Sequence, residues 1–189
     1  MKKTLTIILA FALVIAMSVA GTVAYLTSQD SVTNTFTVGK VKITLDEAEV
    51  DANGAVTSAE RVKANSYKLI PGHAYTKDPI IHVDASSEEC WLFVKVENGI
   101  SAIEDSANTI AAQLEANGWS AVTGADGVYA YKESVAGRTD VPVFGSFKIA
   151  GNAAVADYAN AKVVVTAYAV QADGFEDAAA AWTASGFGT

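Results

Sequence analysis

The sequence has few of the residues that cross-link chains or bind catalytic metals. Cys90 is its only cysteine, so no intramolecular disulfide can form and the fold must rest on a hydrophobic core. We interpret Cys90 as a buried small side chain, with a covalent dimer as the alternative. The two histidines, His73 and His82, lie in no H-E-x-x-H motif and in no cluster with zinc-ligand spacing. We therefore predict a protein that is not an enzyme, with no catalytic residues, no metal and no cofactor.

Basic residues are also scarce. The segment before Tyr25 carries two lysines, so the chain without it has 11 basic and 21 acidic side chains, a net charge of −10. An acidic surface of this kind repels phosphate backbones, which excludes nucleic acid as a partner. The total of 189 residues fits one domain and a targeting segment.

The N-terminal segment has the three parts of a signal peptide. Lys2 and Lys3 precede the apolar run Leu5–Ala20, and small residues follow it up to Ala24. Cleavage is expected after Ala20 or after Ala24, and the alternative is an uncleaved membrane anchor. Membrane contact is thus expected only through this segment before cleavage. We predict a secreted protein with a signal peptide at 1–24, an N-terminal strand at 25–39 and a β-domain at 40–189.

The segment after the signal changes its alternation at Gly39. Apolar side chains fall on even positions before this glycine and on odd positions after it. They are Val32, Phe36 and Val38 on the first side, and Val41, Ile43 and Leu45 on the second. Because side chains alternate faces along a strand, a shift of one residue indicates a bulge or a hinge, and glycine permits either. The two halves are therefore predicted to bury their side chains against different surfaces.

The rest of the chain indicates β-structure with two helices. Strands are expected at PIIHVD, at CWLFVKVEN (a central strand), and over three further segments, with helical spacing between Ile103 and Leu114 and again after Phe175. The further segments are Val128–Lys132, Val143–Ile149 and Val163–Ala172, the last being the strongest strand pattern. This order predicts a mainly β, antiparallel, jelly-roll-like β-sandwich with one or two inserted or terminal short helices, preceded by an N-terminal signal helix.

Two patterns have competing interpretations. The segment Glu49–Glu60 has oxygen-bearing side chains and a glycine at the spacing of a calcium loop, but it begins with Glu and follows a strand, so a solvated hairpin loop is the preferred interpretation. Trp119, Tyr129 and Tyr131 are compatible with an aromatic binding stripe, and core or cross-strand packing is preferred.

Three stretches together resemble a known family. They are AYLTSQDSVTNTFTVGKVKITLDE after the signal, YKLIPGHAYTKDPIIHV, and WLFVKVENG. They resemble exported proteins processed by a SipW-type signal peptidase, a family that includes TasA, camelysin (CalY) and the clostridial BsaA-type biofilm pilins. The resemblance covers the signal through about Gly99, and the closing AYAVQADGF more loosely.

The resemblance implies a secreted Gram-positive protein of the extracellular matrix or cell surface, a jelly-roll subunit of biofilm fibres. It implies signal cleavage between Ala24 and Tyr25, with the signal peptidase and further copies of the chain as partners. Residues 25–38 would donate a strand to the next subunit, with Val32, Phe36 and Val38 as its apolar side chains and Gly39 as the hinge. Such head-to-tail contacts build homopolymers.

Other interpretations remain open at this stage. The N-terminal segment can instead fold back as an edge strand of its own domain. A camelysin-like secreted metalloprotease is an alternative that rests on family analogy alone. A surface adhesin or ligand-binding β-sandwich is the third hypothesis.

Overall fold

The computed structural model describes residues 40–187. The signal segment, the cleavage site at Ala24 and Tyr25, and the predicted strand with Val32, Phe36, Val38 and Gly39 lie outside the described residues. Within residues 40–187, no helix is long and apolar enough to cross a membrane. The predicted fold class is confirmed: the domain is mainly β and antiparallel, with a β-sandwich and two short helices.

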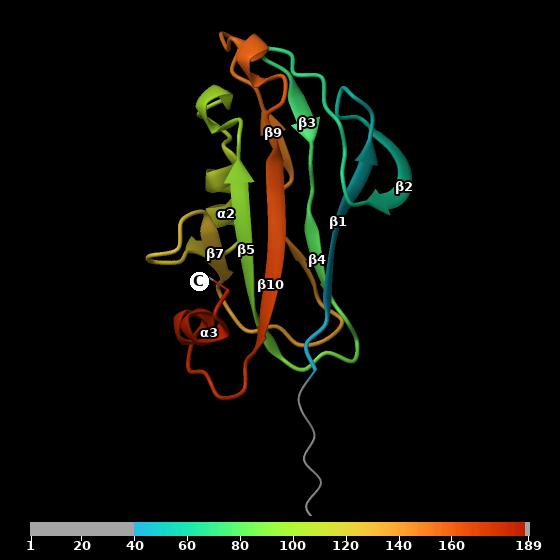
Figure 1. The fold of residues 1–189 in the computed structure, drawn as a ribbon. Coiled ribbons are helices and arrows are strands. Elements are labelled where there is room, and N and C mark those ends of the chain that lie inside the picture. The colour runs from blue at the N-terminus through green and yellow to red at the C-terminus, as the bar shows by residue number, and fades with distance from the viewer. Residues whose placement is uncertain (1–39, 188–189) are drawn as a thin grey trace, which may run out of the picture. The chain divides into compact units, whose positions relative to one another are not determined.

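Two four-stranded antiparallel sheets and one two-stranded ladder make up the domain (Figure 1). The first sheet has the order β2-β1-β4-β8, the second has the order β10-β5-β7-β6, and β3 pairs with β9. The strands of the first sheet are β1 (Ile43–Val50), β2 (Val56–Val62), β4 (Ile80–Val83) and β8 (Asp140–Pro142). Those of the second are β5 (Cys90–Asn98), β6 (Trp119–Ala121), β7 (Val128–Tyr131) and β10 (Val163–Gln171). The ladder consists of β3 (Ala74–Thr76) and β9 (Ser146–Lys148).

The chain crosses between the two sheets three times, after β4, after β7 and after β9, as in jelly-roll-like sandwiches. The longest ladder joins β5 to β10 over nine residue pairs, from Val163 opposite Asn98 to Gln171 opposite Cys90. β5 also pairs with β7, so the prediction that CWLFVKVEN is a central strand is confirmed.

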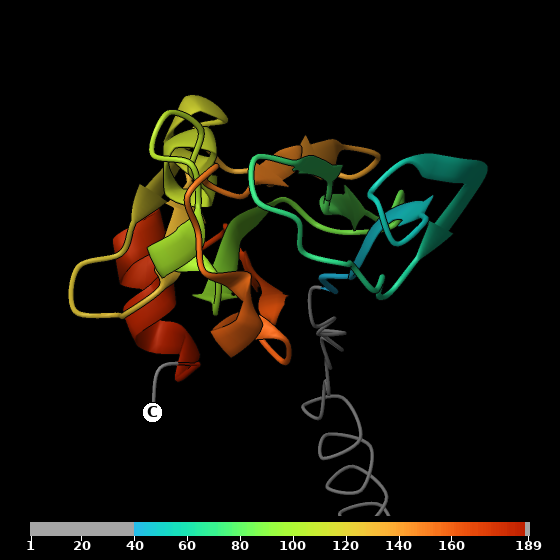
Figure 2. The ribbon, with the colours of Figure 1, turned by 90° about the horizontal axis from the view of Figure 1, so that it is seen from above.

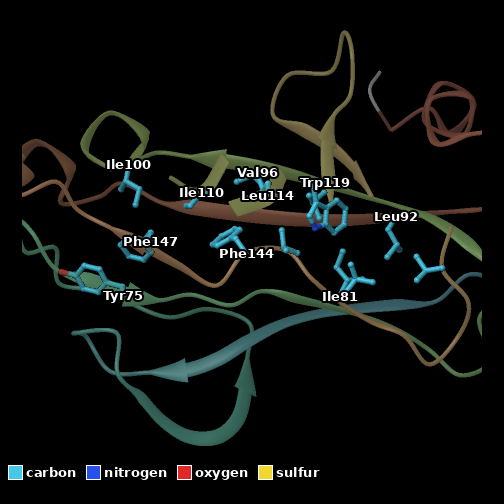
Figure 3. Close-up of a cluster of buried hydrophobic side chains, with 14 of the residues drawn as sticks. Tyr75, Ile81, Leu92, Val96, Ile100, Ile110, Leu114, Trp119, Phe144 and Phe147 are labelled. Atoms are coloured by element: carbon cyan, nitrogen blue, oxygen red, sulfur yellow. The ribbon is translucent and has the colours of Figure 1, made fainter. Parts of the chain in front are cut away.

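The main core lies between the two sheets. Figure 3 shows its side chains converging from both layers, with Trp119 and Leu92 facing Ile81, and Phe147 close to Tyr75. Each of these five side chains is almost fully buried. Cys90 is fully buried in the same core, which confirms the interpretation as a small hydrophobic side chain.

A second apolar cluster covers the other face of the β10-β5-β7-β6 sheet. Helix α3 (Ala178–Ser185) packs there, and its Trp182 contacts Phe93 of β5 and Tyr168 of β10. Figure 2 shows α3 on the side of this sheet that faces away from β1 and β2. The Asp177 side chain caps the helix by accepting a hydrogen bond from the Ala180 N–H.

The inserted helix is shorter than predicted. Helix α2 (Ile110–Ala116) begins seven residues after Ile103, which lies instead in a short 3₁₀ helix, Ser101–Ile103. Between the two helices the Asp105 N–H donates to the Lys148 carbonyl, so this stretch of chain is tied to the sheet. The Thr109 side chain then caps α2.

The predicted strand Val143–Ile149 was wrong in extent, since β9 covers only Ser146–Lys148, and the strands β2, β3, β6 and β8 were missed. Val143 and Phe144 are both buried, which breaks the alternation, and the Gln113 side chain of α2 accepts hydrogen bonds from the N–H groups of Gly145 and Ser146. Strand β2 had no sequence signal because its side chains are mostly exposed.

Candidate functional site

Strand β10 forms an unusually bare edge of the sandwich. Its nine residues, VVVTAYAVQ, include no charged residue and no proline, and none of them is fully buried. Within the described residues β10 pairs on one side only, with β5. Proteins commonly protect a sheet edge with charges, prolines or a covering segment, since a bare apolar edge is a template for another strand.

The hydrogen-bond phase of the β10–β5 ladder shows which backbone groups face outward. The Gly99 N–H donates to the Lys162 carbonyl, and the Ala172 N–H donates to the Glu89 carbonyl, both at 2.8 Å. Bonded and non-bonded pairs alternate in an antiparallel ladder, so the even-numbered residues of β10 bond to β5. The odd-numbered residues turn their N–H and C=O groups to the opposite side. They are Val163, Val165, Ala167, Ala169 and Gln171.

A groove of about 790 Å³ opens beside the first half of this edge. Its apolar lining comes from both sheets and from the ladder between them. These side chains include Leu45, Ile100, Phe147, Val163 and Val165. Val164 also lines the groove, so the groove meets the first three residues of β10, and two of these, Val163 and Val165, turn their backbone groups outward.

The other outer strands are short or carry charges. β2 includes Glu60 and Arg61, and β6 has three residues. Where β1 extends beyond its pairing with β2, Lys63 Nζ donates to the Leu45 carbonyl and the Arg61 guanidinium donates to the Asp46 carbonyl. On the far side of the same sheet β8 has three residues and ends at Pro142, a residue that is tolerated on edge strands. By comparison, β10 is the edge best suited to receive a strand.

A polar cluster lies at one side of the groove. Glu47 of β1 is only 5% exposed and is the one buried charged residue in the part of the chain that the structure describes. Its Oε2 accepts from Lys77 Nζ at 2.5 Å, and its Oε1 accepts from Asn65 Nδ2 at 2.9 Å. All three residues line the groove.

His82 belongs to a second polar cluster on the first sheet. Its Nδ1 lies 2.6 Å from Asp140 Oδ1, and its Nε2 lies 3.0 Å from Asp46 Oδ1. Burial opposes the imidazolium, but the hydrogen bonds to the two carboxylates outweigh it and raise the pKa of His82. Burial likewise opposes the Asp46 carboxylate, and the hydrogen bonds from Arg61 and His82 outweigh it and lower the Asp46 pKa. The cluster thus ties β4 to β1 and β8, which fits a structural histidine.

The candidate calcium loop is a hairpin. Glu49 lies in β1, Glu60 lies in β2, and the turn between them is closed by Asp51, whose Oδ1 accepts from the N–H groups of Asn53 and Ala55. A group of three or more potential metal-binding side chains is absent from residues 40–187.

The other sequence candidates are packing residues. Trp119 is buried and its ring centroid lies 5.1 Å from that of Tyr131 on the neighbouring strand, so the preferred cross-strand interpretation is confirmed for this pair. His73 Nε2 lies 2.8 Å from the Asn53 carbonyl and its ring stands edge-on to Tyr75.

Sequence reasoning missed the groove, the edge position of β10 and the cluster around Glu47. The absence of charge in VVVTAYAVQ did not indicate the edge position, since a central strand buried on both faces also lacks charges. In comparisons with known proteins, no family model, no curated protein and no solved structure matches the chain.

Proposed function

We propose that this chain is a secreted structural subunit of extracellular biofilm-matrix fibres, in which residues 25–39 of one copy add a strand to β10 of the next. The observation that carries the proposal is the apolar, uncharged edge of β10 beside a groove. The sequence resemblance described above supports the fibre class.

Strand addition would satisfy the backbone of the β10 edge. Five odd-numbered residues offer their N–H and C=O groups there, and each hydrogen bond contributes about 0.5–1.5 kcal/mol net. From Val32 to Val38 the donated segment has threonines on odd positions, so its other face would place Val32, Phe36 and Val38, together with Asn34, toward the groove. Pockets for alternate side chains supply specificity in this mode of recognition.

The contact is heterologous, because the donated strand and the accepting edge are different parts of the chain. A heterologous contact that does not close into a ring continues indefinitely and builds a filament. The subunit needs no disulfide for this assembly, in agreement with the burial of Cys90.

The proposal is tested first by deletion. Protein that begins at Tyr25 is expected to form filaments in negative-stain electron microscopy, and protein that begins at Lys40 is expected to stay monomeric. Filaments from the shorter protein, or monomers from both, would contradict strand donation.

A matched pair of substitutions tests the accepting edge. Ala167→Pro removes an N–H that faces outward and leaves the β5 ladder intact, so the domain should fold and filaments should be lost. Ala167→Ser keeps the N–H and should polymerise like the wild type. Circular dichroism and thermal unfolding establish that both variants are folded. A folded Ala167→Pro protein that still polymerises would place the accepting surface elsewhere.

A further inference from the structure

Glu47, Lys77 and Asn65 form an arrangement that is more specific than a buried ion pair. A single buried carboxylate holds an amine on one oxygen and a carboxamide on the other. The Lys77 side chain is only 11% exposed and the Glu47 side chain 6% exposed. A primary amine is a nucleophile once it has lost its proton, and a carboxamide carbon is an electrophile.

The surroundings of Asn65 favour attack at its amide carbon. The Val50 N–H donates to Asn65 Oδ1 at 3.0 Å, which is the oxygen that gains negative charge when a nucleophile adds to the carbon. Asn65 Nδ2 donates to Glu47 Oε1 at 2.9 Å and to the Ala48 carbonyl at 2.8 Å. The amide nitrogen, which would leave if a nucleophile replaced it, therefore lies next to the carboxylate. The amide is thereby held on both sides by β1.

We propose that Lys77 and Asn65 join in an intramolecular isopeptide bond, formed autocatalytically with Glu47 as the proton carrier. Glu47 accepts a proton from the Lys77 ammonium, and the resulting amine attacks the Asn65 amide carbon. Glu47 passes that proton to the amide nitrogen, and the C–N bond breaks to release ammonia. The attacking nitrogen then loses its second proton through Glu47 to the ammonia, which leaves as ammonium. One N–C bond forms and one breaks, so the step requires no oxidant and no cofactor.

The position of the Glu47 carboxylate suits a proton carrier, because it contacts the Lys77 amine with one oxygen and the Asn65 amide nitrogen with the other. Tyr67 lies in the same groove, and its burial together with the charges of Glu47 and Asp78 holds its pKa well above the usual range. Tyr67 therefore stays neutral and donates its hydroxyl to the Thr76 carbonyl at 3.0 Å.

The bond would fasten the segment after β2 to the segment between β3 and β4. Both residues belong to one copy, so the reaction is independent of polymerisation. In a chain without intramolecular disulfides it supplies a covalent closure that reducing conditions do not break.

Intact mass spectrometry of the purified, denatured protein tests the proposal. The wild type is expected about 17 Da below its sequence mass, the mass of one ammonia. Tryptic digestion should yield a branched peptide that contains both Asn65 and Lys77, with no cleavage after Lys77. A wild-type mass equal to the sequence mass would overturn the proposal, whatever the variants do.

Three variants locate the reaction. Lys77→Arg and Glu47→Gln should both restore the sequence mass, because the first removes the nucleophile and the second the proton carrier. Lys63→Arg, which changes another lysine of the groove, should keep the loss of ammonia. A loss that persists in Lys77→Arg would indicate cyclisation of an asparagine by itself and would refute the cross-link.

Discussion

Gly54 allows the β1–β2 hairpin to pack on Tyr75. Substitution of this glycine tests how much the close packing contributes to the free energy of unfolding. The residue has a φ of +80°, and a Cβ built on it would lie 2.7 Å from Tyr75 Cα. Gly124 has nearly the same φ, +79°, and no atom within 4 Å of its Cβ position. The two glycines thus share the conformational requirement and differ in the space around them.

The expected losses in the free energy of unfolding follow from this difference. Gly124→Ala should cost about 1–2 kcal/mol, the penalty of a left-handed conformation for an L-residue. Gly54→Ala carries the same penalty and also forces the backbone of the hairpin from that of Tyr75, which adds about 1–3 kcal/mol. The predicted loss for Gly54→Ala is therefore about 2–5 kcal/mol.

Urea unfolding followed by tryptophan fluorescence measures both losses. The two variants should share the wild-type m-value and differ in midpoint, because only the native packing is changed. Equal losses for Gly54→Ala and Gly124→Ala would refute the close approach of the hairpin to Tyr75.

Two further predictions concern titratable groups. Because the native pKa of His82 is raised, the charged ring stabilises the fold below the unfolded pKa of about 6.5, and this contribution is lost as the pH rises through the native value. The stability advantage of the wild type over His82→Gln should therefore shrink in urea titrations as the pH rises from about 6.5 through the raised native pKa of His82, and a constant advantage would contradict the ion pairs. Burial, together with the neighbouring Glu89 charge, raises the pKa of Cys90 to about 11, so the thiol should react with iodoacetamide at neutral pH only after unfolding; rapid labelling of the native protein would contradict its burial.

The strands with a clear apolar pattern were predictable from the sequence. CWLFVKVEN is β5 with the predicted bounds and central position, because a strand covered on both faces leaves a continuous apolar run. β10 was recognised as a strand from its run of β-branched and apolar residues, but its place at an edge was not predicted, since alternation records the faces of a strand and not its neighbours.

Features that depend on one distant side chain were beyond the sequence pattern. The break between Val143 and Ser146 is stabilised by Gln113, which lies more than thirty residues earlier. The partners of Glu47 come from the segments after β2 and after β3, and only the packed sheets bring these segments together. The side chains of β2 are mostly exposed, so only its pairing with β1 defines it as a strand.

The two halves of β10 present different outer faces. Val164 is 40% exposed on the first half, whereas Tyr168 on the second half packs against Trp182 and Phe187. A polypeptide aligned with the first half would keep the side chains of its outer face in water. A polypeptide aligned with the second half would place those side chains beside the aromatic rings of Tyr168, Trp182 and Phe187. The edge therefore discriminates between sliding positions of an incoming segment, so that a mismatch of two residues carries an energetic penalty although the backbone bonds are the same.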